Sequence, residues 1–245
     1  MENTKVALIT GAVKRIGATL SRTLHAQGYN LILHYRSSSA DADLLLSELN
    51  EIRPDSVIKL QADLNDMEAV HNLAKSAISQ WGGIDLLINN ASSFYPTPIE
   101  NSTQEQWDEL INSNLRAPYF LCSALANTLK ENKGCIINMI DIHAQRGLPG
   151  HPIYSIAKAG LQMMTLSLAK ELAPSVRVNG VSPGPILWPA ADLSEDQKQT
   201  ILNQTLLNRT GSPDDLAEAV LYLSKAPFVT GQILSVDGGK SLYSH

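Results

Sequence analysis

The fold is decided by the stretch from Cys135 to Lys170, CIINMIDIHAQRGLPGHPIYSIAKAGLQMMTLSLAK. An apolar run ends at Asp141, a loop rich in glycine and proline follows, and a helical pattern then carries Tyr154 and Lys158. Because these two residues are four apart, they share one face of a helix and lie one turn from each other. A phenol beside an ammonium is a proton donor with a lowered pKa, since the positive charge favours the phenolate.

Apolar runs and helical patterns alternate from one end of the chain to the other. The expected strands are Lys5–Thr10, Leu31–His34, Val57–Gln61, Leu86–Asn89, Cys135–Ile140, Arg177–Val181 and Gln232–Val236. The expected helices are Ile16–Gln27, Ala40–Ile52, Asp66–Trp81, Thr103–Asn112, Pro118–Asn132, one from Tyr154 to about Leu172, Ser194–Asn208 and Pro213–Ser224. This alternation predicts a doubly wound α/β (Rossmann) fold with a seven-stranded parallel sheet and helices on both faces. Since no linker, repeat or composition shift interrupts the pattern, residues 1–245 are expected to form a single domain.

Composition and charge limit the kinds of protein that this chain can be. Of its 245 residues, 44% are hydrophobic and 18% are charged, as in an ordinary globular protein. The formal charge of −5, without a cluster of lysine or arginine, argues against nucleic-acid binding. No stretch approaches the ~18–20 apolar residues of a membrane span. The first expected strand starts too early to leave room for a signal peptide.

The cysteines and histidines indicate the redox compartment of the protein and whether it binds a metal. Cys122 and Cys135 lie in apolar surroundings and are expected to be reduced, buried thiols. The six histidines have no metal-ligand spacing, so we expect no bound metal. His143 and His151 are interpreted as loop residues that flank the central motif. Together these features favour a cytoplasmic protein.

The turn after the first expected strand favours a phosphate site. Residues 10–17, TGAVKRIG, lead from a strand into a helix, which aims backbone N–H groups and the positive end of the helix dipole at an anion. Gly11 permits the tight turn, and Gly17 permits close packing of the helix. Taken alone, two glycines are also compatible with an ordinary strand-to-helix turn.

The end of the second expected strand predicts which dinucleotide binds. An acidic residue there would accept hydrogen bonds from the adenosine ribose and repel a 2′-phosphate. This chain has Tyr35-Arg36-Ser37-Ser38, and a guanidinium followed by hydroxyls suits a phosphate dianion. The sequence therefore predicts NADPH rather than NADH, with a solvated loop arginine as the alternative interpretation of Arg36.

Taken together, these residues resemble the short-chain dehydrogenase/reductase family over nearly the whole chain. The motifs that carry the resemblance, in the family's order and spacing, are the Thr-Gly-x-x-x-x-x-Gly turn, Asn89-Asn90-Ala91, Asn114, Tyr154-x-x-x-Lys158, Pro183-Gly184 and Asp237-Gly238-Gly239. Each motif is weak alone, but the set is very specific.

Three departures from the general family pattern indicate one branch. Arg15 replaces the middle glycine of the first turn, Ser92 follows Asn-Asn-Ala where a glycine is usual, and Asp141 stands in place of the catalytic serine. All three are similar to the pteridine reductases, a branch that includes the bacterial dihydromonapterin reductases.

The resemblance implies hydride transfer from NADPH to a pterin, with catalytic roles for four residues. Tyr154 would donate the proton, and Lys158 would lower its pKa and hold the nicotinamide ribose. Asp141 would share a proton with Tyr154 and pass it on, which a serine cannot do. Asn114 would support a water-linked proton path to Lys158; a helix-bending asparagine is the alternative.

The resemblance also implies a set of cofactor contacts. They are Gly11, Arg15, Ile16, Tyr35, Arg36, Ser37, Asp63, Leu64, Asn90, Ala91, Ser92, Tyr154, Lys158, Pro183, Gly184 and Ile186. Among them, Asp63 is expected to accept from the adenine amino group while Leu64 packs beside the ring. Pro183, Gly184 and Ile186 match the loop that contacts the nicotinamide carboxamide.

Substrate contacts and assembly are implied in the same way. The expected substrate-binding residues are Arg15, Ser92, Phe94, Asp141, Tyr154 and Trp188. Phe94 would stack on the pterin face opposite the nicotinamide, and Trp188 would belong to a substrate lid of about residues 185–210. The family commonly forms tetramers, and the apolar stretches Leu161–Leu168 and Phe228–Val236 are compatible with a homotetramer.

Several alternatives stay open on the sequence alone. The nearest is the same fold acting on a carbonyl, such as a 3-oxoacyl thioester, although Asp141 and Phe94 argue against it. An epimerase of the extended family would need a longer C-terminal substrate domain. A non-catalytic NADPH-binding protein is disfavoured by the complete set of catalytic residues. The choice among dihydromonapterin, dihydrobiopterin, oxidised pterins and dihydrofolate is not decided by the sequence.

Overall fold

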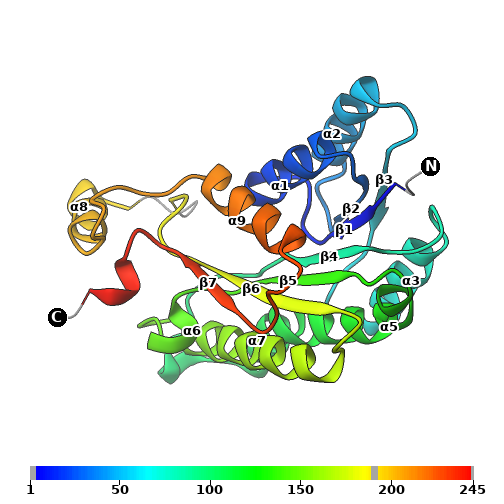
Figure 1. Ribbon diagram of the computed structural model, residues 1–245. Helices are drawn as coiled ribbons and strands as arrows, with labels where there is room; N and C mark the ends of the chain where they lie inside the picture. Colours follow the sequence, from blue (N-terminus) through cyan, green and yellow to red (C-terminus); the bar gives the residue numbers. More distant parts are fainter. Residues whose placement is uncertain (1–3, 189–192, 244–245) are drawn as a thin grey trace.

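The structure, a computed structural model, describes residues 4–188 and 193–243 of the chain. Its strands form a parallel sheet in the order β3-β2-β1-β4-β5-β6-β7 (Figure 1). Their bounds are β1 (Val6–Ile9), β2 (Asn30–Tyr35), β3 (Val57–Gln61), β4 (Leu86–Asn89), β5 (Cys135–Met139), β6 (Arg177–Pro183) and β7 (Ile233–Val236). The order changes direction between β1 and β4, which is the switch point where such sheets bind ligands. The predicted doubly wound, seven-stranded sheet is confirmed.

Helices cover both faces of the sheet (Figure 1). One face carries α1 (Arg15–Ala26), α2 (Ser39–Ile52) and α9 (Pro213–Lys225). The opposite face carries α3 (Met67–Ile78), α5 (Ala117–Glu131) and α7 (Pro152–Glu171). The described residues also form α4 (Gln104–Ile111), α6 (His143–Arg146), α8 (Glu195–Asn203) and 3₁₀ turns at Ile99–Asn101 and Lys240–Leu242.

The hydrophobic core consists of two layers, one on each face of the sheet. Successive side chains of a strand point to opposite faces. In β1, Ala7 and Ile9 therefore join the layer under α1, α2 and α9, whereas Val6 and Leu8 join the layer under α3, α5 and α7. Because a strand buried on both faces is apolar throughout, continuous apolar runs were sufficient to predict the strands.

Two helices end earlier than the sequence predicted. The helix expected over Asp66–Trp81 runs as α3 only to Ile78, and Trp81 adopts a left-handed conformation with φ 47° that interrupts a helix. The helix expected over Ser194–Asn208 is α8 and ends at Asn203. Since α8 has no buried residue, no apolar face extends it by packing.

The two helices expected at Thr103–Asn112 and Pro118–Asn132 form one continuous helical run. A π-helical turn, η2 (Asn112–Arg116), joins α4 to α5. Turns of this kind arise from one extra residue in the hydrogen-bond ladder and occur frequently at functional sites. This turn carries the buried side chain of Asn114.

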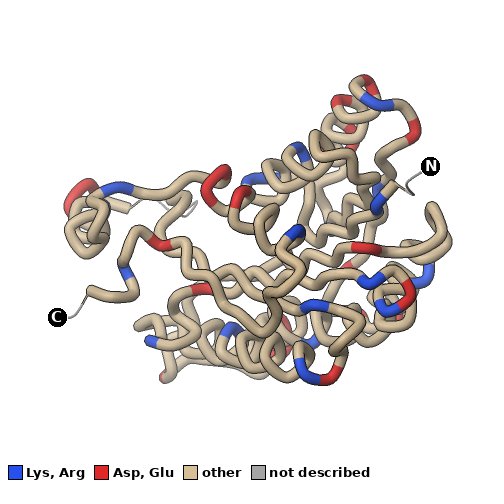
Figure 2. Tube along the Cα trace, viewed as in Figure 1, with Lys and Arg blue, Asp and Glu red and all other residues tan. Residues whose placement is uncertain are grey.

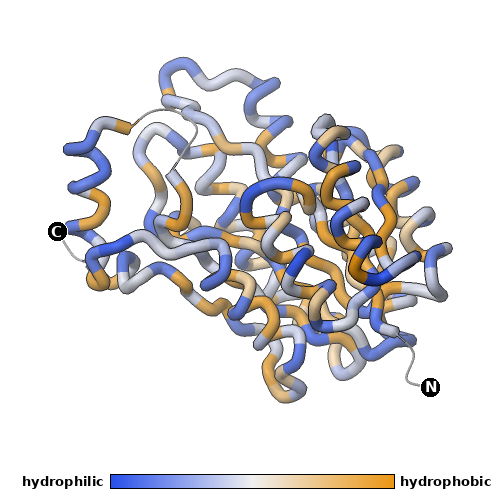
Figure 3. The backbone as a smooth tube through the Cα atoms, turned by 90° about the horizontal axis from the view of Figure 1, so that it is seen from above, coloured by the Kyte–Doolittle hydropathy of each residue, from blue (hydrophilic) through white to orange (hydrophobic). Residues whose placement is uncertain are grey.

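The surface mixes charges of both signs along the chain trace (Figure 2). The helix α8 projects at one end of the molecule (Figure 1) and is mostly hydrophilic (Figure 3). None of the helices in the described residues combines the length and the apolar character needed to cross a membrane. Cys122 and Cys135 are buried and free of disulfides, as predicted.

The packing of α1 against the turn before it gives a stability prediction. A Cβ atom on Gly17 would lie 2.0 Å from the carbonyl oxygen of Gly11, which is a backbone atom. We expect Gly17→Ala to lower the free energy of unfolding by about 1–3 kcal/mol, the usual cost of overpacking, as measured by urea denaturation. Ala26→Ser, an exposed change on the same helix, is the control. A Gly17→Ala protein as stable as wild type would mean that the turn moves away from α1 without cost.

Candidate active site

A helix N-terminus without a side-chain cap lies at the switch point of the sheet. Lys14 occupies the N-cap of α1, but among the described residues no side chain caps this helix, and its first turn has no acidic residue. The leading N–H groups of α1 therefore remain available to an anion, which the helix dipole also favours. Gly11, with φ 61°, lets the turn approach Ala91 closely. This arrangement fits the pyrophosphate of a dinucleotide.

Thr10 and Asn90 fasten this turn to the end of β4. The Thr10 hydroxyl oxygen accepts from the backbone N–H groups of Asn90 and Ala91, at 2.9 and 3.0 Å. The Asn90 side-chain amide donates to the carbonyl oxygens of Thr10 and Gly11, at 2.9 and 3.0 Å. Two of the predicted cofactor contacts, Asn90 and Ala91, therefore also shape the turn on which the cofactor would rest.

The buried side chain of His34 supports the same turn, and it was not identified from the sequence. Its Nδ1 accepts from the Gly11 N–H at 3.1 Å, and its Nε2 lies 3.1 Å from the carbonyl oxygen of Ala62. Only a neutral ring with its proton on Nε2 satisfies both contacts. Burial lowers the pKa of His34 to about 4, which keeps that ring neutral. A polar residue inside an apolar strand was the available signal.

Arg15 adopts a backbone conformation that glycine usually occupies. Its φ of 49° lies in the left-handed region, which costs other residues free energy and persists where the surroundings enforce it. Its guanidinium Nη2 donates to the carbonyl oxygen of Trp188 at 3.1 Å. The structure thus brings together two residues predicted to contact the substrate. Within the expected lid, residues 189–192 lie outside the described part of the chain.

The side chains predicted to hold the 2′-phosphate lie at the end of β2. Tyr35 is buried, whereas Arg36 and Ser37 are exposed. Among the described residues, no carboxylate forms an ion pair with Arg36. Its charge is therefore available to an anion, as a 2′-phosphate site requires.

The residues expected beside the adenine lie near the end of β3. Asp63 is exposed, and its Oδ1 accepts from the backbone N–H and the side-chain amide of Asn65, at 2.9 and 3.0 Å. Leu64 is buried, and Ile16, at the start of α1, is half-buried. The expected contacts of Asp63 and Leu64 with an adenine stay predictions.

The two proposed proton carriers are in direct contact. The Tyr154 hydroxyl, which lies near the start of α7, donates to Asp141 Oδ2 at 2.9 Å, and Asp141 Oδ1 accepts from the N–H of His143 at 2.8 Å. Tyr154 is buried and Asp141 is half-buried. Burial, together with the charge and hydrogen bond of Asp141, raises the pKa of Tyr154 well above its ordinary value.

The expectation that the pKa of Tyr154 is lowered is wrong for this structure. Lys158 is buried, its ammonium donates to the carbonyl oxygen of Met139 at 2.9 Å, and it lies 5.6 Å from the centre of the Tyr154 ring. The pKa of Tyr154 is raised and not lowered, because burial and the charge and hydrogen bond of Asp141 favour the protonated phenol. Burial also lowers the pKa of Lys158 to about 8, with Asp141 opposing that shift.

Phe94 lies directly beside the donor. Its ring meets the Tyr154 ring edge to face, with centroids 4.8 Å apart, and stacks on His151 at 4.7 Å with the planes within 5°. Phe94 remains 46% exposed. The contact of His151 with Phe94 was not predicted. In the described residues, no cluster of histidine, cysteine, aspartate or glutamate has the composition of a metal site.

Asn114 and Ser92 form a second polar cluster next to these rings. The Ser92 hydroxyl donates to Asn114 Oδ1 at 2.6 Å. The Asn114 amide donates to the carbonyl oxygens of Ser93 and Leu110, both at 3.0 Å. The π-helical turn therefore aims Asn114 at the loop after β4.

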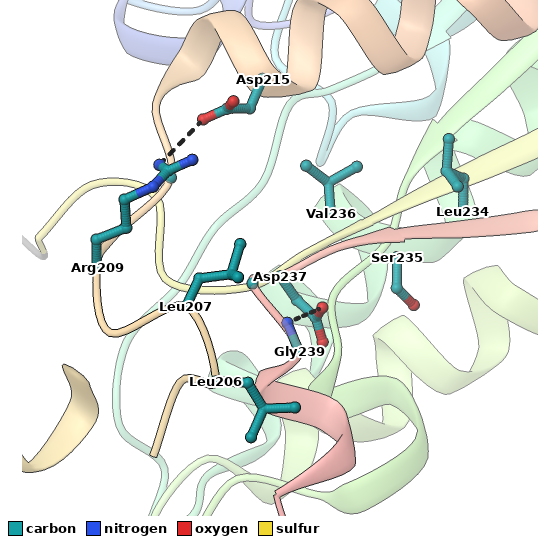
Figure 4. Close-up of a pocket in the computed structure, with 11 residues that line it drawn as sticks. Leu206, Leu207, Arg209, Asp215, Leu234, Ser235, Val236, Asp237 and Gly239 are labelled. Carbon is teal, nitrogen blue, oxygen red and sulfur yellow. Dashed lines mark hydrogen bonds and ion pairs between the residues drawn. The ribbon is translucent and has the colours of Figure 1, made fainter. Parts of the chain in front are cut away.

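The loop after β6 carries the residues predicted for the nicotinamide. The carbonyl oxygen of Pro183 accepts from the N–H of Ile142 at 3.2 Å, the Gly184 N–H donates to the carbonyl oxygen of Val236 at 3.0 Å, and Ile186 is buried. Beside this loop, a pocket of about 450 Å³ lies between residues 206–211 and the end of β7 (Figure 4). Its lining includes neither Asp141 nor Tyr154.

Fold and site together define a class of protein, an oxidoreductase that works with a nicotinamide dinucleotide. Comparisons with known proteins agree with this class. A family model described as Enoyl-(Acyl carrier protein) reductase matches residues 11–241. The chain is 37% identical to Pteridine reductase 1 of Leishmania tarentolae, over 97% of this chain and 96% of that protein.

Other relatives carry a different activity in their names. The chain is 35% identical to the 3-oxoacyl-(acyl-carrier-protein) reductase FabG of Staphylococcus aureus strain Mu50, over 98% of this chain and 99% of that protein. It is also 35% identical to the 3-oxoacyl-(acyl-carrier-protein) reductase of Synechocystis, over 98% of each. The chain therefore belongs to the short-chain dehydrogenase/reductase family, as the sequence motifs predicted, and the two activities are represented at similar identity.

The neutral, buried His34 predicts how stability depends on pH. Its folded-state pKa of about 4 lies below its ordinary value of 6.5. Between these two pH values, the unfolded chain binds a proton that the folded chain does not. This contribution to stability is therefore complete above pH 6.5, and it falls by ~1.4 kcal/mol per pH unit as the pH drops toward 4.

His34→Asn removes this titration while keeping a polar side chain at the position. Urea denaturation at pH 7 and pH 4.5 should show a loss of unfolding free energy that is roughly 2–3 kcal/mol larger in wild type than in His34→Asn. His71→Asn, at an exposed histidine, should behave like wild type. Equal losses in wild type and His34→Asn would contradict the neutral form.

Proposed function

We propose that this protein is an NADPH-dependent pteridine reductase, which transfers a hydride to a dihydropterin such as dihydromonapterin or dihydrobiopterin and also accepts oxidised pterins or dihydrofolate. The observation that carries the proposal is the hydrogen bond between the Tyr154 phenol and the Asp141 carboxylate. By family resemblance, a carbonyl reductase has a serine at position 141, which only hydrogen-bonds the substrate. An aspartate connects the phenol to a second group that can carry a proton.

NADPH would supply the hydride when bound. Tyr154, whose raised pKa keeps it protonated at neutral pH, donates its proton to the pterin nitrogen next to the carbon that accepts the hydride. A proton from bulk solvent then reaches the phenolate through Asp141, which accepts it, passes it to Tyr154 and ends as a carboxylate again. Lys158 holds the ribose of the nicotinamide and stabilises the phenolate by its charge, while Asn114 supports the water path. These roles use side chains that already lie together.

An exposed aromatic face supports a flat substrate. Since Phe94 is 46% exposed and its ring centre lies 4.8 Å from that of Tyr154, a pterin stacked on the exposed part of the Phe94 ring would lie beside the proton donor. Arg15 and Ser92 are proposed to supply polar contacts to the pterin. Trp188, bonded to Arg15 through its carbonyl oxygen, is proposed to contact it from the lid.

Reduction of a 3-oxoacyl thioester is the second candidate. The relatives named for that activity are almost as similar to this chain as the pteridine reductase is. Asp141 and the exposed Phe94 ring favour the pterin, because a thioester carbonyl needs neither a second proton carrier nor a ring stack.

We also propose that the protein has a substrate lid and assembles as a tetramer. Residues of about 185–210 form a lid on the single domain of 1–245, and the protein is a homotetramer. Exposed apolar side chains within the two predicted interface stretches support the assembly: Met163 is 62% exposed, Leu234 is 38% exposed, and Phe228 is fully exposed. Apolar surface of this kind is favourably buried against another copy of the chain.

The direct test is NADPH oxidation, followed by absorbance, with four substrates in parallel: dihydrobiopterin, dihydromonapterin, dihydrofolate and an acetoacetyl thioester. We expect turnover of the pterins, because the site offers a ring stack and a two-group proton relay. Turnover of the thioester alone would assign the protein to the second candidate function. NADPH binding without turnover of any substrate would favour a non-catalytic protein.

Variants of Tyr154 and Asp141 test the proposed proton transfer directly. Tyr154→Phe keeps the ring but removes the proton, so turnover should fall by at least ~100-fold while NADPH binding is retained. Asp141→Ser should impair pterin reduction more than thioester reduction, because it restores the side chain typical of carbonyl reductases. If Asp141→Ser reduces pterins at the wild-type rate, the aspartate has no part in the reaction.

Arg36 tests the choice of cofactor separately. Arg36→Ala removes a guanidinium that forms no ion pair within residues 4–188 and 193–243, so the Michaelis constant for NADPH should rise by ~10-fold or more while that for NADH changes little. Arg22→Ala, an exposed arginine paired with Glu48, is the matched control. Equal effects of Arg36→Ala on both cofactors would place the 2′-phosphate elsewhere.

A further inference from the structure

The short helix α6 connects the proposed catalytic aspartate to the C-terminal end of the described chain. At its start, Asp141 Oδ1 accepts from the N–H of His143 at 2.8 Å. At its end lies Arg146, the last residue of α6. A helix of four residues has little stability of its own. Its orientation therefore depends on its contacts with the rest of the chain. Ala144 packs against the core layer under α3, α5 and α7, and the Asp141 carboxylate holds the first turn.

Arg146 provides a further contact, at the C-terminal end of α6. Its Nη1 donates to the carbonyl oxygens of Lys240 and Ser241, both at 2.9 Å, and its Nη2 donates to the carbonyl oxygen of Tyr243 at 2.7 Å. One guanidinium therefore holds three carbonyl groups of the C-terminal turn, which its planar fork of donors is suited to do. The side chain is exposed, but three bonds from one rigid group restrict the turn more than a single bond would.

The same C-terminal turn contacts the segment that follows α8. The Leu207 N–H donates to the carbonyl oxygen of Gly238 at 3.0 Å, and the Lys240 ammonium donates to Gln204 Oε1 at 3.2 Å. A Cβ atom on Gly239 would lie 2.8 Å from the Leu206 side chain, so the two segments are closely packed. Figure 4 shows Leu206 and Leu207 beside the turn that contains Asp237 and Gly239.

The turn itself is rigidly built. Asp237 Oδ1 accepts from the Gly239 N–H at 2.9 Å, and its Oδ2 accepts from the Ser241 N–H at 2.8 Å. Residues 237–243 thus form a compact turn. Arg146 contacts this turn on one side, and residues 204–207, which belong to the proposed lid, contact it on the other. Through α6, this turn leads to the carboxylate that accepts from Tyr154.

We propose that Arg146 is a positioning residue for the reductase reaction. It holds α6 so that the Asp141 carboxylate stays in contact with Tyr154, and it ties this arrangement to the lid segment through residues 240–243. The inference rests on the proposed roles of Asp141 and Tyr154. Without Arg146, α6 would lose the attachment at its C-terminal end, and a displacement of the carboxylate by about 1 Å is enough to slow a positioned reaction up to ~100-fold.

The test compares wild type, Arg146→Ala and Arg146→Lys, with Arg22→Ala as the matched control on α1, across the sheet from α6. We expect Arg146→Ala to lower kcat/KM for the best pterin by roughly 10- to 100-fold, with the dissociation constant of NADPH, measured by fluorescence, unchanged. Arg146→Lys keeps the positive charge but has one nitrogen in place of the planar fork, so its kcat/KM should lie between those of wild type and Arg146→Ala. Millimolar guanidinium ion should restore part of the activity of Arg146→Ala and leave Asp141→Ser unaffected.

A double-mutant cycle separates positioning from a general loss of stability. If Arg146 acts through Asp141, adding Arg146→Ala to Asp141→Ser should cost far less than it does in wild type. An Arg146→Ala enzyme within about twofold of wild type, or one that guanidinium does not rescue, would overturn the inference. Failure of wild type to reduce any pterin would instead overturn the proposed function, and the cycle would then be run on the substrate that is reduced.

Discussion

The hydrogen bond from the Tyr154 hydroxyl to Asp141 Oδ2 joins the first turns of α7 to the end of β5. A phenol and a carboxylate in a poorly hydrated site are stable only when each has a partner, since an unsatisfied buried polar group costs about 1–3 kcal/mol. The bond therefore adds a polar link to the apolar packing that holds α7 against the sheet. It also keeps the proton on Tyr154, and the neighbouring contacts of Lys158 and Phe94 are arranged around it.

Unusual backbone geometry gathers around this site. Arg15 has a left-handed φ where glycine is usual, and the π-helical turn at Asn112–Arg116 departs from regular α-helix. Such features cost free energy and persist only where the surrounding structure enforces them. Here the two apolar layers of the sheet provide that support, because they hold the strand ends in fixed register. The stability of the core thus allows the site to keep conformations that would be unfavourable in isolation.

The sequence was sufficient to predict the sheet, because its strands are buried on both faces and appear as continuous apolar runs. It also located Asp141, Tyr154 and Lys158, since motif spacing on a helix and at a strand end is local information. The sequence did not predict the direction of the Tyr154 pKa shift, because this shift depends on burial and on distances between elements. The contacts of His34, Arg146 and His151 were missed for the same reason: their partners lie far away in the sequence.

The charges around Tyr154 explain why an aspartate and a buried lysine are useful together. Burial lowers the pKa of Lys158 to about 8, so its ammonium is still protonated at neutral pH and balances the Asp141 carboxylate. Once Tyr154 gives up its proton in the proposed reaction, its phenolate and the carboxylate repel each other, which favours reprotonation. A serine at position 141 would produce no such repulsion. The aspartate therefore makes Tyr154 a weaker acid but one that is readily restored, a combination that suits a substrate with a basic acceptor nitrogen.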